Sequence, residues 1–205
     1  MMPNPELSRR GGTVDEIELA RAQEYTLLST LLLRSPEVGL LQRLQRLRGD
    51  ESALGVAHQA LADSAARIDA ERASREYFAL FIGVGRGELL PYASYYLTGF
   101  LHGRPLANLR QDLQRLGIER ADGQSEPEDH AGILLEIMAG LAGGVIPGPA
   151  GADRRFFQDH LAPWIGAFYS DLQRATSAQF YAAVGKLGTT FLDIERQGFQ
   201  LAPSA

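Results

Sequence analysis

The stretch "FYAAVGKLGTTFLDI", residues 180–194, carries the most regular apolar pattern in the chain. Its large apolar side chains recur by fours and threes, at Phe180, Val184, Leu187, Phe191 and Ile194. Residues three and four apart share one face of an α-helix. The stretch therefore predicts a long helix that packs these five side chains against other helices.

Helical spacing also dominates the rest of the chain. Thr13 and Glu16 form a predicted capping box for the first helix, and residues 35–37 (Ser-Pro-Glu) are typical of a helix start. Pro163 is expected to kink or split a helix near the C-terminus. No alternating apolar pattern indicates a β-strand. The sequence thus predicts an all-α, single-domain helical bundle of about nine or ten helices.

Two segments interrupt the helical pattern. Residues 1–12 are predicted to be a flexible N-terminal segment that precedes an all-helical domain over residues 13–200. Within that domain, "AGGVIPGPAGAD", residues 142–153, is rich in glycine and proline and is a candidate hinge.

The N-terminal segment contains two adjacent arginines, Arg9 and Arg10, as twin-arginine export signals do. The residues that follow include Asp15, Glu16 and Glu18, where an export signal would need an uncharged apolar run. No run of about 18 apolar residues occurs that could span a membrane. We therefore expect the protein to stay in the cytoplasm.

Composition limits the classes of function. The 205 residues contain no cysteine, which excludes disulfides, thiolate metal sites and cysteine nucleophiles. The formal net charge of -5 argues against general nucleic-acid binding, which needs a basic face. Five of the acids lie between Ile118 and His130, beside a single base, Arg120. This stretch favours a cationic partner.

The acidic stretch leads into "SEPEDHAGILLEIMAGL", residues 125–141. Ser125 and Glu128 are predicted to form a capping box, with the acids solvated at the helix start. A cap alone accounts neither for His130 nor for the surplus of acids. The segment could be a metal site, an acid/base site, a cradle for a cation or only a stable helix start.

A metal or catalytic site is one of these alternatives. Glu126 and His130 are four residues apart and could share a helix face, with Asp129 beside them. However, no second Glu-x-x-His motif supplies the remaining ligands of a usual metal site. The glycine loop "GVGRG" lacks the lysine and Ser/Thr of a phosphate-binding loop. A metal- or nucleotide-dependent hydrolase that uses Glu126, Asp129 and His130 remains the alternative hypothesis.

Tyrosines gather around the same glycine loop. Tyr77, Tyr92, Tyr95 and Tyr96 are four of the seven tyrosines in the chain. Tyrosine combines an apolar ring with a polar hydroxyl, a mixture found on surfaces that bind peptides. Together with Phe81 they could form a groove for an apolar segment.

Three segments together resemble a known family. "YFALFIGVGRGELLPYASYYL" (residues 77–97), "EPEDH" (126–130) and "ILLEIMAGL" (133–141) follow in the order and spacing of the TorD/DmsD/NarJ family of redox-enzyme maturation chaperones. That family shows an aromatic residue, Leu-Phe, a glycine-rich loop, a proline beside an aromatic residue, and later E-P-x-D-H. The chain departs from it where Tyr77 and Tyr92 replace tryptophans found in part of the family.

The resemblance implies a non-catalytic, cytoplasmic chaperone. Such proteins bind the twin-arginine signal peptide and/or the apo-form of a molybdenum-cofactor oxidoreductase and delay export until the cofactor is inserted. The resemblance allows weak binding of a guanine nucleotide as the one cofactor, and it implies no bound metal. It also implies that the chain is a monomer or a domain-swapped dimer.

The resemblance also implies the residues of a peptide-binding site, to which the charge pattern adds Glu126. Asp129, with Glu126 or Glu128, could pair with arginine while the aromatic patch takes the apolar part of the peptide. The predicted peptide-binding residues are Tyr77, Leu80, Phe81, Pro91, Tyr92, Glu126, Asp129 and His130.

Overall fold

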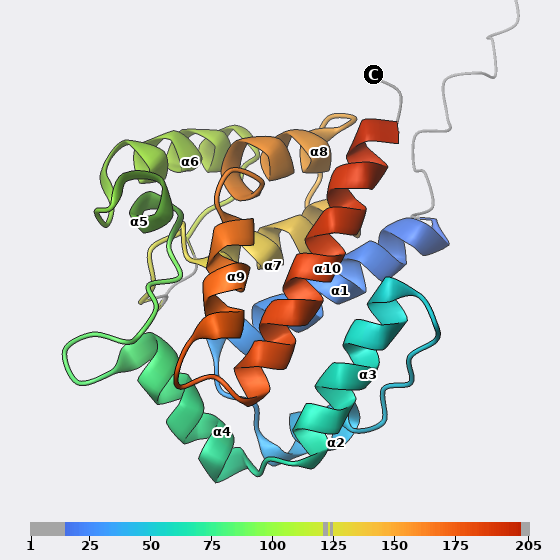
Figure 1. The fold of residues 1–205 in the computed structure, drawn as a ribbon. Coiled ribbons are helices and arrows are strands. Elements are labelled where there is room, and N and C mark those ends of the chain that lie inside the picture. The colour runs from blue at the N-terminus through green and yellow to red at the C-terminus, as the bar shows by residue number, and fades with distance from the viewer. Residues whose placement is uncertain (1–14, 121–122, 124, 202–205) are drawn as a thin grey trace, which may run out of the picture.

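The computed structural model describes residues 15–120, 123 and 125–201, which form ten α-helices and two short π-helical segments (Figure 1). In chain order they are α1 (Glu16–Leu33), α2 (Val38–Leu44), α3 (Ala53–Ala66), α4 (Ala70–Tyr77), η1 (Phe78–Ile82), α5 (Ala93–Thr98), α6 (Gly103–Arg115), α7 (Ala131–Ala142), α8 (Ala152–Phe156), η2 (Phe157–Leu161), α9 (Ile165–Arg174) and α10 (Phe180–Leu201). No β-strand occurs among the described residues. The prediction of an all-α bundle is confirmed.

Three helix contacts organise the bundle. Helix α1 packs along α7, and α10 packs against both α9 and α3. Helices α6 and α8 lie at one end of the molecule, and α2 and α4 lie at the other (Figure 1). Small residues permit the close approach of α1 and α7: a Cβ atom on Gly132 would lie 2.6 Å from Cγ of Leu33. The Ser29 hydroxyl also donates a hydrogen bond to the carbonyl of Gly132, 2.8 Å away, and so fixes the two helices in register.

The predicted C-terminal helix is confirmed as α10, with one change in its buried face. Phe180, Val184, Leu187 and Phe191 are buried, but Ile194 is 41% exposed, so its predicted place in the core is wrong. The predicted positions repeat strictly every seven residues, whereas a straight helix drifts by about 20° per seven residues. The buried stripe therefore shifts to Glu195, which is 3% exposed.

Two predicted helix starts are wrong in detail. Helix α1 begins at Glu16, and its capping box joins Asp15 to Glu18, while Thr13 lies outside the described residues. Helix α2 begins at Val38 after an extended Glu37 in the cap position. The chain is still extended there, so the serine three residues before the helix cannot cap it.

The predicted break at Pro163 is confirmed. Segment η2 ends at Leu161 and α9 begins at Ile165, with Pro163 in the turn between them. The N-terminal segment 1–12 lies outside the described residues. Residues 142–153 connect α7 to α8, and their role as a hinge stays a prediction. None of the helices described is both long and apolar enough to cross a membrane.

Candidate functional site

The E-P-E-D-H segment leads into α7 through a turn at Glu128 and Asp129, closed by a hydrogen bond from the amide of His130 to the carbonyl of Pro127 at 3.1 Å. It pairs with the segment that leads into α5, through an isolated antiparallel bridge between Tyr92 and His130. The amide of Ala93 donates to the carbonyl of Asp129 at 3.0 Å, and the amide of Ala131 donates to the carbonyl of Pro91 at 2.7 Å. The two motifs that carried the family resemblance therefore meet in space.

His130 is the N-cap of α7. Its Nδ1 accepts a hydrogen bond from the amide of Gly132 at 3.1 Å, and the helix begins at Ala131. The predicted capping box of Ser125 and Glu128 is therefore wrong, because both residues precede the helix. The Nδ1 acceptor requires an imidazole with its proton on Nε2. His130 is 4% exposed, and burial lowers its pKa to about 4. The negative charges of Glu126 and Asp129 act in the other direction and raise the pKa, but by less.

The lowered pKa of His130 predicts a loss of stability in acid. In the unfolded chain the imidazole takes up a proton below its ordinary pKa of 6.5, whereas in the folded protein it stays neutral down to about pH 4. The contribution of His130 is therefore present above pH 6.5 and is lost as the pH falls toward 4. Between about pH 7 and pH 5 it should cost about 2 kcal/mol. Urea unfolding of wild type and His130→Asn at both pH values measures this difference, because Asn keeps a capping oxygen but does not titrate.

The matched control for this experiment is His102→Asn. His102 is exposed and adopts a φ of 70°, a conformation that Asn tolerates. We expect this variant to keep the pH dependence of the wild type. An equal pH dependence in His130→Asn and the wild type would contradict the assignment to His130.

Glu128 belongs to an ion pair rather than to a cap. Its Oε2 accepts hydrogen bonds from Nη2 and Nε of Arg110 on α6, at 2.8 and 3.1 Å. Burial alone would raise the pKa of Glu128, but these bonds and the charge of Arg110 outweigh burial and hold the pKa below its ordinary value. Glu128 is 8% exposed and Asp129 is 1% exposed, so the expectation of solvated acids is wrong for both. The cause is the turn before α7, which brings Glu128 to Arg110 on α6 and Asp129 to the start of α5 instead of leaving them at a free helix end.

Asp129 makes a different set of contacts from Glu128. Its Oδ2 accepts a hydrogen bond from the amide of Ser94 in the first turn of α5, at 2.9 Å. Its Oδ1 is buried and has no hydrogen-bond partner. Oδ2 therefore stabilises the start of α5, whereas the hydrogen-bonding capacity of Oδ1 is unsatisfied.

Tyr77, Tyr92 and Glu126 form a partly exposed cluster on the side of the bridge where the Tyr92 and His130 rings meet. The Tyr92 hydroxyl donates to Oε2 of Glu126 at 2.5 Å, and the Tyr77 hydroxyl donates to the carbonyl of Leu32 at 3.2 Å. Burial, and then the charge of Glu126, raises the pKa of Tyr77 to about 12. Burial, then the hydrogen bond to Glu126 and the charge of Glu126, raise the pKa of Tyr92 above its ordinary value. Both phenols therefore stay protonated and can act as donors at neutral pH.

The remaining predicted site residues lie beneath this cluster. Leu80 is fully buried and Phe81 is 9% exposed, with the Phe81 ring packed against Tyr77 and Tyr181. Pro91 is also buried. These three residues support the site from the core and do not form its surface.

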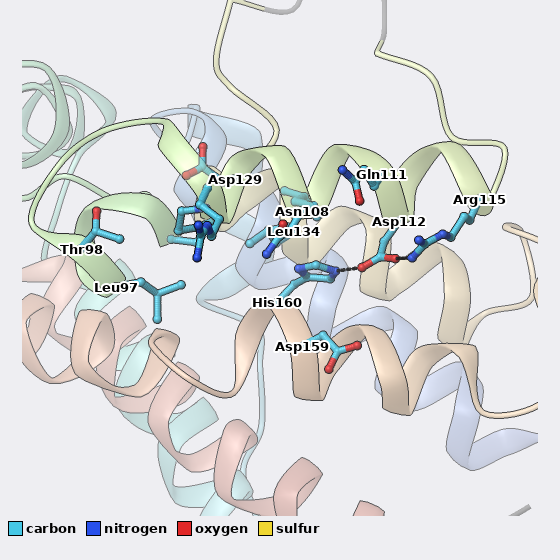
Figure 2. A pocket seen from close by; sticks show the side chains of 14 residues that line it. Leu97, Thr98, Asn108, Gln111, Asp112, Arg115, Asp129, Leu134, Asp159 and His160 are labelled. Carbon is cyan, nitrogen blue, oxygen red and sulfur yellow. Dashed lines mark hydrogen bonds and ion pairs between the residues drawn. The ribbon is translucent and has the colours of Figure 1, made fainter.

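A pocket of about 480 Å³ lies where α5, α6 and η2 meet, and Asp129 lines it (Figure 2). Asp129, Leu97 and Thr98 mark one end of the pocket, and Asp112, Arg115 and His160 mark the other. The lining includes neither Glu126 nor Tyr92. Of the eight predicted residues, three form the tyrosine cluster and Asp129 lines this separate pocket. The other four are buried: Leu80, Phe81, Pro91 and His130.

Asp112 and His160 were missed by the sequence analysis. Nε2 of His160 lies 3.0 Å from Oδ2 of Asp112, and Arg115 pairs with Oδ1 of the same carboxylate at 2.5 Å. Only the Asp112–Arg115 spacing of three residues was visible in the sequence. The histidine approaches from η2, 48 residues away, so no local pattern reveals it. In the described part of the chain, no group of three or more His, Asp or Glu side chains is arranged to hold a metal ion.

A family model described as the nitrate reductase delta subunit matches residues 48–170. The match covers more than half of the chain, so the chain belongs to this family. The resemblance to the TorD/DmsD/NarJ family, drawn from the motifs above, is confirmed.

Several relatives carry chaperone names. The chaperone protein TorD of Vibrio cholerae is 28% identical over 59% of each chain, so the match spans about three fifths of that relative. A probable Tat proofreading chaperone, DmsD of Haemophilus influenzae, is 31% identical over 56% of this chain and 55% of its own. TorD of Shewanella loihica matches over 86% of this chain and 91% of its own length, at 26% identity.

The fold also has a solved counterpart. A protein from Archaeoglobus fulgidus, proposed to be a redox enzyme maturation protein, superposes with a TM-score of 0.54. The superposition covers 83% of this chain and 93% of the other, at 22% sequence identity. At this identity the similarity establishes the shared helical fold.

Proposed function

We propose that the chain is a cytoplasmic chaperone for a molybdenum-cofactor oxidoreductase. It would bind the twin-arginine signal peptide and/or the apo-form of that enzyme and delay export until the cofactor is inserted. Family membership and the names of the relatives support the chaperone role. The partly exposed cluster of Tyr77, Tyr92 and Glu126 is the observation that carries the peptide-binding role.

The cluster offers several groups that attract a guanidinium. Glu126 supplies a carboxylate, the group with which a guanidinium pairs, and it accepts a hydrogen bond from Tyr92. The Tyr77 hydroxyl donates a hydrogen bond to the carbonyl of Leu32, in the last turn of α1. The C-terminal end of this 18-residue helix carries negative partial charge. The tyrosine rings add cation–π attraction. An arginine of the signal peptide would be stabilised here.

The apolar part of the signal peptide also finds a complementary surface nearby. Phe78 and Ile82, on η1, are 47% and 49% exposed, and Val84 in the following loop is 98% exposed. They follow Tyr77 directly in the chain, whereas Leu80 and Phe81 point inward. An apolar helical segment would cover this exposed strip while its preceding arginines reach Glu126.

Titration calorimetry with a synthetic twin-arginine signal peptide tests the proposal. We expect micromolar binding that weakens at least about fivefold when both arginines become lysine, because guanidinium binds a carboxylate with two hydrogen bonds. Higher salt should weaken binding further. Glu126→Gln should reproduce most of the loss seen with the lysine peptide.

The matched control is Glu71→Gln on α4, where the side chain is 82% exposed and pairs with Arg75. This variant should bind the peptide as the wild type does. Equal affinity for the arginine and lysine peptides, or an undiminished affinity in Glu126→Gln, would contradict the proposed site.

A further inference from the structure

The turn between α5 and α6 exposes a patch of large apolar side chains. Leu97, Phe100 and Leu101 are 44%, 77% and 43% exposed, and we call these three residues the apolar corner. Single apolar side chains are common on protein surfaces, but three of them within five residues form a patch. Such patches mark a contact with another molecule.

The backbone holds the apolar corner in one shape. The amide of His102 donates to the hydroxyl of the buried Ser94 at 2.9 Å, and the amide of Phe100 donates to the hydroxyl of Thr98 at 3.3 Å. His102 has a φ of 70°, a conformation that is costly for a residue other than glycine. Because the corner is already ordered, a partner that binds it loses little of the conformational freedom of this turn.

The apolar corner lies in a part of the sequence that has no acidic residue. None occurs between Glu88 and Asp112, although the whole chain has a net charge of -5. Arg104 follows the corner in the first turn of α6 and is exposed. Within the described part of the chain, its side chain has no hydrogen-bond or ion-pair partner. Arg110, the other arginine of this stretch, already pairs with Glu128. Arg104 therefore adds an uncompensated positive charge beside the corner.

The acids of the adjoining pocket do not compensate Arg104. Asp112, at the far end of the pocket in Figure 2, and Asp159 have basic partners of their own. Asp129 lies at the end marked by Leu97, but it is 1% exposed and its Oδ2 accepts from the amide of Ser94. Arg104 is therefore available to a carboxylate from another molecule.

The pocket itself can take an apolar side chain. Leu97 and Arg104 both line it, so the corner and the guanidinium lie at its edge. The rest of its lining includes the buried side chains of Ala93, Leu109 and Leu134. An apolar side chain that leaves water here would contact these residues. The surface thus combines an apolar slot, an exposed apolar corner and one cation.

We propose that the apolar corner and the pocket form a docking site for a polypeptide segment in which an acidic residue lies between apolar residues. The carboxylate pairs with Arg104, one apolar neighbour enters the pocket, and the other covers Phe100 and Leu101. The partner's charge is opposite to that of a twin-arginine signal peptide. The site is therefore distinct from the tyrosine cluster, and the inference does not depend on the signal-peptide proposal.

A titration followed by the NMR signals of the backbone amides tests the site directly. The probe is the blocked pentapeptide Gly-Phe-Glu-Leu-Gly, compared with the same peptide in which neutral glutamine replaces glutamate. We expect the largest shifts at residues 97–104 and a Kd below about 1 mM for the glutamate peptide. The glutamine peptide should bind at least about fivefold more weakly, because it cannot form a charged pair with Arg104.

A charge reversal at Arg104 separates the local contact from the overall charge. Arg104→Glu should weaken binding of the glutamate peptide at least about fivefold and should prefer Gly-Phe-Lys-Leu-Gly. This variant is expected to fold, because an acidic residue is favourable in the first turn of a helix. The matched control is Arg46→Glu, which makes the same change in net charge at an exposed position after α2 and should bind as the wild type does. Phe100→Ser tests the apolar half and should also weaken binding at least about threefold.

Several outcomes would overturn the proposal. They are equal affinity for the glutamate and glutamine peptides, undiminished binding in Arg104→Glu or Phe100→Ser, and no binding by the wild type up to about 5 mM. Shifts concentrated at residues 77–84 would instead assign the peptide to the strip proposed for the signal peptide. A dimer of the wild type that dissociates in Phe100→Ser, measured by analytical ultracentrifugation, would assign the apolar corner to a second copy of the chain.

Discussion

Replacing Glu76 by alanine is expected to destabilise the protein by about 3–5 kcal/mol. Glu76, on α4, is 8% exposed, and its carboxylate accepts three hydrogen bonds from amides at the start of α10. The donors are Gln179 at 2.8 Å, Phe180 at 3.1 Å and Tyr181 at 2.7 Å. Alanine would leave these amides without partners and would remove a negative charge from the positive end of a 22-residue helix.

Urea unfolding followed by circular dichroism measures this loss, with Glu71→Ala as its matched control. Glu71 lies on the same helix, but its side chain is 82% exposed and pairs only with Arg75 one turn away. Its replacement should cost less than about 0.5 kcal/mol. Similar free energies of unfolding for the two variants would show that Glu76 does not cap α10.

The segments that form helices could be predicted, because helix formation depends on the spacing of apolar residues within each segment. The pattern of Phe180 to Phe191 is complete within one helix, and so is the break at Pro163. Helix starts were harder to predict, because more than one nearby residue can act as a cap: Asp15 rather than Thr13 precedes α1, and His130 rather than Ser125 caps α7. Other starts are held from far away in the chain. The first amides of α10 bind Glu76, which is more than 100 residues earlier, and no pattern around residue 180 reveals this partner.

The candidate site was partly predictable for the same reason. The family motifs correctly indicated that Tyr92 and His130 belong together, and they meet in the antiparallel bridge. The arrangement of the acids was not predictable, because the segment was treated as the first turn of a helix. In a helix Glu126 and Asp129 would share a face, but the chain bends at Glu126 and turns at Glu128 and Asp129, so the two carboxylates meet different partners. Glu126 therefore contacts Tyr92, and Asp129 contacts the first turn of α5.

The segment before α7 has several structural roles. One short segment stabilises the starts of two helices, through His130 for α7 and Asp129 for α5. The same segment supplies a carboxylate to the tyrosine cluster and another to the pocket. A substitution of Asp129 is therefore expected to change stability, because it removes the acceptor for the amide of Ser94 at the start of α5.

Replacing Glu195 by alanine is expected to cost a further large amount of stability, about 3–5 kcal/mol. Glu195, on α10, is 3% exposed and accepts from both Nε and Nη2 of Arg21, at 2.7 and 2.8 Å. The Tyr25 hydroxyl donates to the same carboxylate at 2.7 Å, and Asp153 contacts Arg21 from α8 at 2.9 Å. Burial alone would lower the pKa of Arg21, but the two carboxylates outweigh it and raise that pKa. Alanine at 195 would leave Arg21 charged, with Asp153 as its remaining carboxylate partner.

The expected cost arises because Arg21 and Tyr25 lose their hydrogen-bond acceptor, and not because the ion pair itself contributes a large net stabilisation. A triple variant tests this distinction. Arg21→Met, Tyr25→Phe and Glu195→Leu together replace the three partners by apolar side chains of similar size, so no buried donor is left unsatisfied. We expect the triple variant to be more stable than Glu195→Ala alone, although it removes more of the network. Asp193→Ala, whose side chain is 59% exposed on the same helix, should stay close to the wild type in the same urea titration. A triple variant that is less stable than the single one would mean that the pair attracts more strongly than its desolvation costs, and that the network itself holds α1, α8 and α10 together.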